Sequence, residues 1–312
     1  MSSAMIIASA PAGGIHSYFS SKCFFILYTI LFERGIAMKN LSLAFSPCPN
    51  DTFMFYGIVN KKIPLDFSIT TTLRDVEVLN RAAREYTFDI SKLSCFAFGQ
   101  VAEKYCILRS GAALGKGCGP LLLARKGKTL DQHATIAIPG EMTTAHLLLR
   151  LFLGNQIKTQ TMPFDQIMPA MQRGEIEYGV VIHEGRFTYQ NYNLVCLQDL
   201  GYFWEESFHL PIPLGIIAGK RECGKNMLKS FEKALSQSIT YSWNNRGSVY
   251  PYIKQHAQEM QENVIFSHID LYVTKESQRL SDEGQKAICF LLQKAMHYHW
   301  IEPFLLEKCF LE

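Results

Sequence analysis

Short apolar runs alternate with longer amphipathic runs along most of the chain, beginning at Leu41. Short apolar runs bounded by turn residues predict strands, whereas longer runs with a period near 3.6 residues predict helices. A repeated order of strand and helix is typical of strand–helix units packed around a mainly parallel sheet. The pattern therefore predicts an α/β fold.

Four junctions, each from a predicted strand into a following polar segment, stand out in this pattern. The strands lie at residues 41–45, 88–93, 135–138 and 178–182. Ligands of open α/β sheets bind beside the carboxyl ends of the strands. We therefore expect the functional residues to follow these four strands.

The predicted helices follow the strands and fill the C-terminal third of the chain. The first begins near Thr52, with Asn50 or Asp51 as its cap. The others are expected at residues 95–104, 145–153, 164–173, 224–244, 250–262 and 281–298. Pro169 lies inside one of them and predicts a kink or a break there.

Two strand-like crossings, near residues 121–123 and 214–218, divide the predicted elements into two groups. We expect a larger α/β lobe made of residues 38–124 and 213–312, and a smaller inserted α/β lobe made of residues 125–212. A chain of 312 residues is long enough for two such lobes. Two lobes joined by two strands form a clamshell, and the ligand is expected in the cleft between them.

The first 37 residues are predicted to lie outside this fold. Their apolar run, Cys23–Phe32, has the length of a signal-peptide core and is too short for a bilayer span, which takes about 20 apolar residues. Met38 then opens the first predicted strand, so residues 1–37 are interpreted as an upstream extension from a misassigned start. Export is the competing interpretation.

Composition excludes several classes of function. Charged residues make up 19% of the chain and the formal net charge is +3, without a basic run interleaved with aromatics, so nucleic acid is not expected as a partner. The nine cysteines include no Cys-x-x-Cys pair, which favours reduced thiols in a cytoplasm over disulfides or a structural zinc site. His297 and His299 lack a third ligand at metal-binding spacing, so neither a metal nor another cofactor is expected.

His183 is the leading candidate for a catalytic residue. It stands where the apolar run Tyr178–Ile182 ends. Histidine has an ordinary pKa of roughly 6.5, which suits proton transfer near neutrality, so we interpret His183 as a general base. The alternative from the residue alone is a hydrogen-bonded structural histidine.

Two predicted helix starts carry hydroxyl groups. Ser94 precedes one helix, and the pair Thr143 and Thr144 precedes another in the other lobe. A helix N-terminus presents unpaired amides and the positive end of the helix dipole, so it can hold a carboxylate without a lysine. Together these starts predict a carboxylate clamp, and the alternative for each is an ordinary N-cap.

The segment Ser46–Phe53 contains two prolines, which stiffen the loop between strand and helix. On such a platform Asn50 is a candidate hydrogen-bond partner for a ligand, and Cys48 is a weaker candidate nucleophile because no histidine lies nearby in sequence. The glycine-rich segment 111–120 fails the spacing of a phosphate-binding loop and is interpreted as a flexible crossing between lobes.

The residues after His183 supply further candidates. Arg186 is expected to pair with a substrate carboxylate or with Glu184. Glu184 should point away from the imidazole, because successive side chains of an extended strand alternate between faces. Phe187 and Tyr189 are candidate walls that keep water out of the pocket, with plain packing as the alternative.

Five motifs in order along the chain resemble those of the 1,4-dihydroxy-6-naphthoate synthase family. They are Ser46–Phe53 (SPCPNDTF), Ser91–Ser94 (SKLS), Thr143–Ala145 (TTA), His183–Tyr189 (HEGRFTY) and Leu210–Gly215 (LPIPLG). The resemblance extends from Met38 almost to the C-terminus. It implies a periplasmic-binding-protein-like fold of the second type in a cytoplasmic enzyme of the futalosine route to menaquinone.

The resemblance also implies the substrate and the residues that bind it. The substrate would be cyclic dehypoxanthine futalosine, with His183 as the proton acceptor. Substrate contacts would fall on Lys92, Leu93 and Ser94, and on Thr144 with Ala145. No membrane partner is expected, and a homodimer stays open. The alternatives are a chorismate dehydratase of the same pathway, which shares the fold, and a solute-binding protein of a transporter, which needs an exported chain.

Overall fold

The computed structural model describes residues 39–131, 133–258 and 261–312. The apolar run Cys23–Phe32 and the predicted N-terminal extension therefore lie outside the described residues. Within the described part, no helix combines the length and the apolar character that crossing a membrane requires.

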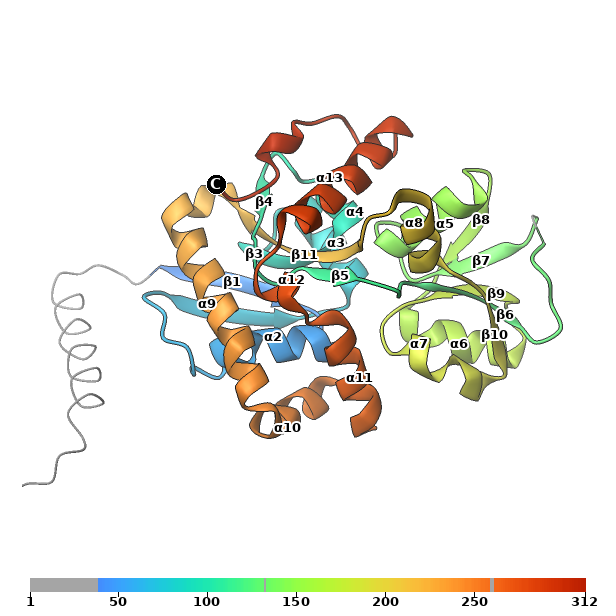
Figure 1. Ribbon diagram of the computed structural model, residues 1–312, viewed down its shortest axis with the longest axis horizontal. Helices are drawn as coiled ribbons and strands as arrows, with labels where there is room; N and C mark the ends of the chain where they lie inside the picture. Colours follow the sequence, from blue (N-terminus) through green and yellow to red (C-terminus); the bar gives the residue numbers. More distant parts are fainter. Residues whose placement is uncertain (1–38, 132, 259–260) are drawn as a thin grey trace, which may run out of the picture. The chain divides into compact units, whose positions relative to one another are not determined.

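Eleven strands in the described residues form two sheets (Figure 1). The strands are β1 (Asn40–Phe45), β2 (Ser68–Leu73), β3 (Ile90–Ser94), β4 (Tyr105–Ile107), β5 (Ala113–Gly115), β6 (Leu121–Arg125), β7 (Thr135–Ile138), β8 (Lys158–Thr161), β9 (Tyr178–Val181), β10 (Leu194–Asp199) and β11 (Ile212–Lys220). The first sheet has the order β2-β1-β3-β11-β4, with β5 also paired to β11, and the second has the order β10-β6-β9-β7-β8.

Both sheets are mixed, which corrects the expectation of a mainly parallel sheet. In the first sheet β1 and β3 are parallel, whereas β11 runs antiparallel to β3, β4 and β5. In the second sheet β7 is parallel to β8 and β9, whereas β6 runs antiparallel to β9 and β10. The antiparallel members include the two strands at which the chain enters the second sheet and returns to the first, a relation that periodicity alone does not encode.

Helices cover both sheets. They are α2 (Pro49–Val59), α3 (Val76–Arg84), α4 (Cys95–Phe98), α5 (Thr144–Leu153), α6 (Phe164–Arg173), α7 (Gly185–Thr188), α8 (Leu200–Phe208), α9 (Lys225–Asn244), α10 (Arg246–His256), α11 (Glu262–Tyr272), α12 (Lys275–Gln278) and α13 (Asp282–His297), with short 3-10 turns η1 (Tyr189–Tyr192), η2 (Arg221–Cys223) and η3 (Leu306–Lys308). Helix α2 packs against α9, α10 and α11 (Figure 1).

Several helix predictions need correction. Helix α2 begins at Pro49, because proline at the first helical position has the required φ and no amide to satisfy, so Cys48 is the N-cap in place of Asn50 or Asp51. Helix α4 is only four residues long. Helix α6 continues through Pro169, so there is no break, and the kink stays a prediction. The segment expected as one helix at 250–262 belongs to α10 and the start of α11.

The buried apolar side chains explain how the sheets are held. One cluster contains residues of both sheets, among them Leu93 and Ile216 of the first and Leu122 and Ile138 of the second. A second cluster lies between the first sheet and helices α2, α9, α10 and α11, and a third lies between the second sheet and α6. An apolar core common to both sheets keeps the strand ends that line the candidate site close together. The lobe boundaries themselves stay a prediction.

Candidate active site

A cavity collects the ends of elements from both sheets. Its lining comes from the junctions after β1, β3, β7 and β9, from β11, and from helix α11. The four predicted junctions therefore meet in one place, and α11 adds a contribution that the sequence pattern did not reveal.

Six of the eight predicted site residues line this cavity, namely Asn50, Lys92, Ser94, Thr144, Ala145 and His183. Leu93 and Arg186 do not. Lys92 and Ser94 are two residues apart on β3 and share a face of the strand, so the side chain of Leu93 points to the other face and is fully buried in the core. Because side chains alternate along the strand, the side chain of Leu93 does not line the cavity, which corrects the expectation that this side chain contacts the substrate.

Arg186 is engaged within the protein. Its guanidinium donates to the carbonyl oxygen of Gly119 at 2.7 Å and pairs with the Asp199 carboxylate at 2.7 Å. Asp199 also caps α8 by accepting from the amides of Gly201 and Tyr202. Arg186 therefore links α7 to β10 and α8, and its expected pairing with a substrate carboxylate or with Glu184 stays a prediction.

His183 adopts a left-handed backbone conformation, with φ of 56°. Strand β9 has ended at Val181, and the chain turns sharply at His183 before α7 begins. A left-handed conformation is unfavourable for a residue with a Cβ, and such strain is found preferentially at functional sites. The turn also corrects the premise used for Glu184, because this residue has helical dihedral angles at the N-cap position of α7 and does not continue an extended strand. Its orientation away from the imidazole stays a prediction.

The imidazole of His183 is held by ring contacts. Phe164 packs edge-on at 4.9 Å between ring centres, and the ring of His268 lies 6.2 Å away at 23° to it. Within the described part of the chain, Nε2 of His183 is buried without a hydrogen-bond partner. The proposed wall residues Phe187 and Tyr189 are not in the lining, and Phe187 is exposed.

Burial is the main influence on the titration of His183. It lowers the pKa of the imidazole below its ordinary value, the charges of Asp75 and Asp51 act in the opposite direction, and Lys92 lowers the pKa further. The result is a neutral imidazole near pH 7, which is the form that accepts a proton.

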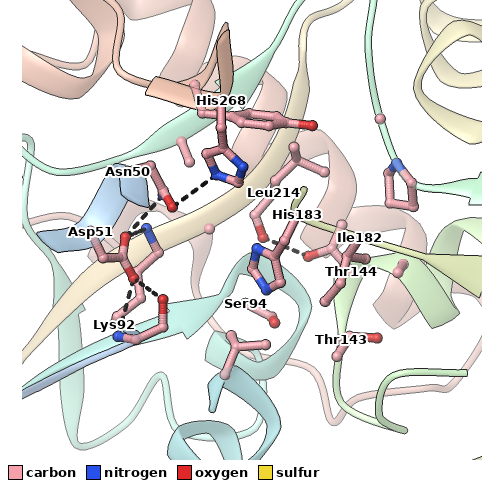
Figure 2. Close-up of a pocket in the computed structure, with 18 residues that line it drawn as sticks. Asn50, Asp51, Lys92, Ser94, Thr143, Thr144, Ile182, His183, Leu214 and His268 are labelled. Carbon is pink, nitrogen blue, oxygen red and sulfur yellow. Dashed lines mark hydrogen bonds and ion pairs between the residues drawn. The ribbon is translucent and has the colours of Figure 1, made fainter. Parts of the chain in front are cut away.

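A buried ion pair, between Lys92 and Asp51, is part of the cavity lining (Figure 2). Lys92 Nζ lies 2.7 Å from Asp51 Oδ1, and the side chains are 6% and 1% exposed. The other carboxylate oxygen, Oδ2, accepts from the hydroxyl and the amide of Ser46. Gly215 lies opposite Ser94 on β11, and a Cβ there would stand 2.7 Å from Cε of Lys92, so glycine provides the room that the lysine needs.

Ser94 and Thr144 have different hydrogen-bond arrangements. Ser94 Oγ accepts from the Asn80 side-chain amide at 3.0 Å, which leaves its hydroxyl hydrogen able to meet a ligand. Thr144 Oγ1 accepts from the Phe96 amide and donates to the Leu214 carbonyl, so its hydrogen is already committed. The hydroxyl of Thr144 therefore joins structural elements, and only the backbone at the start of α5 faces a ligand there.

The acid Glu77 connects the helix α3 to the loop before α5. It is 6% exposed, its carboxylate accepts from the Met142 amide at 3.3 Å, and burial raises its pKa. A Cβ at Gly140 would stand 2.3 Å from this carboxyl group. Gly140 is thus required for the close approach of Glu77 to this loop.

Two residues of α11, His268 and Tyr272, line the cavity and were missed by the sequence reasoning. His268 is 1% exposed, and its Nε2 lies 3.2 Å from Asn50 Oδ1. The side chain of Asn50 is therefore engaged inside the protein. A signal existed, since His268 stands on the apolar face of the run Val264, Ile265 and Ile269, but an isolated histidine there has no partner visible in sequence.

Cys48 does not fit the role of a nucleophile. It is 4% exposed and is absent from the cavity lining. Burial and the nearby charge of Glu184 raise the pKa of its thiol well above the ordinary value, which suppresses the reactive thiolate. No group of three or more His, Cys, Asp or Glu side chains in the described residues is placed to hold a metal ion.

Comparisons with known proteins agree on one family. A family model described as "Menaquinone biosynthesis" matches residues 41–297. A protein of Thermus thermophilus named 1,4-dihydroxy-6-naphthoate synthase is 40% identical over 258 residues, covering 83% of this chain and 94% of its own. A protein of Streptomyces coelicolor with the same name is 39% identical over 265 residues, with the same coverage.

Solved structures agree on the fold. A crystal structure of a protein from Archaeoglobus fulgidus superposes with a TM-score of 0.81 at 31% identity, covering 84% of this chain and 98% of that one. The periplasmic aliphatic sulphonate-binding protein of Escherichia coli superposes with a TM-score of 0.61 at 10% identity, covering 88% and 93% of the two chains. The chain therefore has the two-lobed α/β fold of periplasmic binding proteins, as predicted.

Proposed function

The chain is an enzyme of the 1,4-dihydroxy-6-naphthoate synthase family of menaquinone biosynthesis, and we propose that it converts cyclic dehypoxanthine futalosine to 1,4-dihydroxy-6-naphthoate with His183 as general base. The observation that carries the role of His183 is its free Nε2, buried in the cavity on a strained turn, in a ring whose lowered pKa keeps it neutral. A neutral imidazole with an uncommitted nitrogen is suited to remove a proton.

The aromatic carboxylate of this substrate would bind on the side of Ser94 and α5. The amides of Thr144 and Ala145 precede the first intrahelical bond, which runs from Leu147 to Thr143, so they are available to an anion. The hydroxyl of Ser94 adds a donor. Lys92 has three ammonium hydrogens, of which Asp51 takes one in the described structure, so it adds positive charge and further donors.

The reaction would begin at the sugar-derived part of the substrate. His183 removes a proton there, and the electron pair left behind forms a double bond as the ring opens. The sugar-derived carbons that the product does not retain leave as a separate fragment, and the dihydroxynaphthoate remains. Acid–base help of this kind typically contributes about 10²–10⁴-fold to the rate. Enclosure between the lobes positions the substrate and excludes water.

Two other functions have less support. The relatives from Thermus thermophilus and Streptomyces coelicolor both carry the synthase name, which favours the synthase over a chorismate dehydratase. The likeness to transport-binding proteins at 10% identity concerns the fold alone, so it does not favour transport. A cytoplasmic location accords with the free thiols of the eight described cysteines, and a homodimer stays a prediction.

A mass-spectrometric assay separates the three functions. Purified protein incubated with cyclic dehypoxanthine futalosine is expected to release 1,4-dihydroxy-6-naphthoate, and incubated with chorismate it is expected to leave chorismate unchanged. Dehydration of chorismate would favour the dehydratase. Binding of a small molecule without conversion of either compound would favour a solute-binding protein.

The pH profile tests the base. Since the pKa of His183 is lowered by burial, kcat/KM should fall on the acid side with a midpoint below about 6.5, as protonation removes the base. Asp75 raises this pKa, and it caps α3 by accepting from Glu77. Asp75→Asn keeps an N-cap residue but removes the charge, so the acid midpoint should move to still lower pH. A midpoint that rises in this variant contradicts the assignment.

A further inference from the structure

His268 is a buried histidine in the cavity lining, and the proposed mechanism does not use it. It comes from α11, is 1% exposed, and packs against the ring of Tyr272 at 4.9 Å between centres. Its contacts continue through Asn50 and Asp51 to Lys92, so four side chains from three separate segments form one chain of hydrogen bonds (Figure 2). The direction of these bonds fixes what His268 offers to a ligand.

The orientation of Asn50 follows from its neighbour. Asn50 Nδ2 lies 3.0 Å from Asp51 Oδ1, which also accepts from Lys92 at 2.7 Å. A carboxylate only accepts hydrogen bonds, so the amide nitrogen of Asn50 must face Asp51. The carbonyl oxygen of Asn50 therefore faces His268.

The tautomer of His268 follows in turn. Its Nε2 lies 3.2 Å from that carbonyl oxygen, which cannot donate, so Nε2 must carry the hydrogen. Burial, helped by the nearby His183 and Lys92, lowers the pKa of His268 well below the ordinary value, so the ring is neutral. In a neutral ring with its hydrogen on Nε2, Nδ1 is a bare acceptor.

Nδ1 is also buried without a partner in the part of the chain that the structure describes. An unpaired buried acceptor is costly and therefore requires an explanation, and a ligand that donates a hydrogen bond to it supplies one. The ring of His183 lies 6.2 Å away and nearly parallel, with its own Nε2 unpaired. One bound molecule can therefore reach both imidazoles.

We propose that His268 is a substrate-binding residue whose Nδ1 accepts a hydrogen bond from a hydroxyl group on the sugar-derived part of the substrate, in a tautomer fixed by Asn50, Asp51 and Lys92. The inference rests on the proposed function for the identity of the substrate. It assigns two different duties to the two histidines: His183 takes the proton, and His268 positions the polyol part beside it. A carboxylate ligand has no hydrogen to donate to Nδ1, which places the carboxylate at the other side of the cavity.

A matched pair of variants tests this assignment. The amide of glutamine reaches the position of Nε2, so His268→Gln can still donate to Asn50 but loses the acceptor at Nδ1. Asparagine is shorter and places its oxygen near the position of Nδ1, so His268→Asn keeps the acceptor and loses the contact with Asn50. We expect His268→Gln to raise KM for cyclic dehypoxanthine futalosine by about 10- to 100-fold with a much smaller change in kcat, and His268→Asn to raise it less.

A spectroscopic measurement on the unmodified protein is independent of how the variants fold. Nitrogen-15 NMR of the histidine rings is expected to show His268 with a protonated Nε2 and an unprotonated Nδ1, and a shift of the Nδ1 resonance when substrate binds. Protonated Nδ1 in the free protein would overturn the proposal. So would an unchanged KM in folded His268→Gln, or a loss confined to kcat.

Failure of this inference is distinguishable from failure of the proposed function. If the unmodified enzyme converts the substrate and His268→Gln has an unchanged KM, only the role of His268 is wrong. If the unmodified enzyme neither binds nor converts cyclic dehypoxanthine futalosine, both are wrong.

Discussion

Turnover of cyclic dehypoxanthine futalosine is expected to fall by at least about 10²-fold when His183 is replaced by asparagine, while the substrate still binds. The imidazole is the only group assigned to take the proton, and an amide at this position cannot accept one at neutral pH. Single-turnover rates and equilibrium binding, measured on the same preparation, separate the loss of chemistry from a loss of affinity.

Asparagine is preferred to alanine because of the backbone. His183 has φ of 56°, and asparagine tolerates the left-handed region better than other residues with a Cβ. His183→Ala should lose turnover equally but with additional strain in the turn. Unfolding curves of both variants provide the control for folding. Near-normal turnover in folded His183→Asn would end the claim that His183 is the base.

Lys92→Met is expected to destabilise the protein by about 3–5 kcal/mol. The substitution leaves the Asp51 carboxylate buried, at 1% side-chain exposure, without its cationic partner. The bonds from Ser46 and Asn50 remain, but they do not neutralise the charge. Denaturant unfolding measures the loss directly and is independent of any effect on substrate binding.

Two controls accompany this variant. In Lys92→Met/Asp51→Asn the buried charge is gone, so most of the stability should return, because the cost arises from the unpaired carboxylate. Lys128→Met breaks an ion pair with Glu177 in which both side chains are 45% exposed, and its effect should be far smaller. If Lys92→Met unfolds at the same denaturant concentration as the parent, Lys92 does not stabilise the buried Asp51 carboxylate.

Local sequence pattern was sufficient for the junctions that build the site. Strand β9 was expected because it lies in a short apolar run, and the helix start at Thr143 and Thr144 was expected from its capping hydroxyl. Because parallel strands β7 and β9 expose their carboxyl ends at one edge, the side chains that follow them meet, as expected from the chain alone.

Contacts between side chains that are far apart in the sequence could not be predicted from the local pattern. Arg186 has several acidic residues nearby in sequence, and only the packing of β10 beside β6 brings Asp199 to it. Helix α4 is a second example. The local pattern predicted a helix at residues 95–104, whereas α4 ends at Phe98, and its residues pack into the apolar core.

The sequence by itself determined the α/β class, the strand ends and His183 as the leading titratable group, because these depend on neighbours within a few residues. The tertiary structure alone decided the rest. Lys92 meets Asp51 across 41 residues, and His268 meets Asn50 across 218. These contacts set the tautomer of His268, and burial keeps both imidazoles neutral. Burial and the approach of distant segments both depend on the whole fold, so a local sequence pattern cannot predict them.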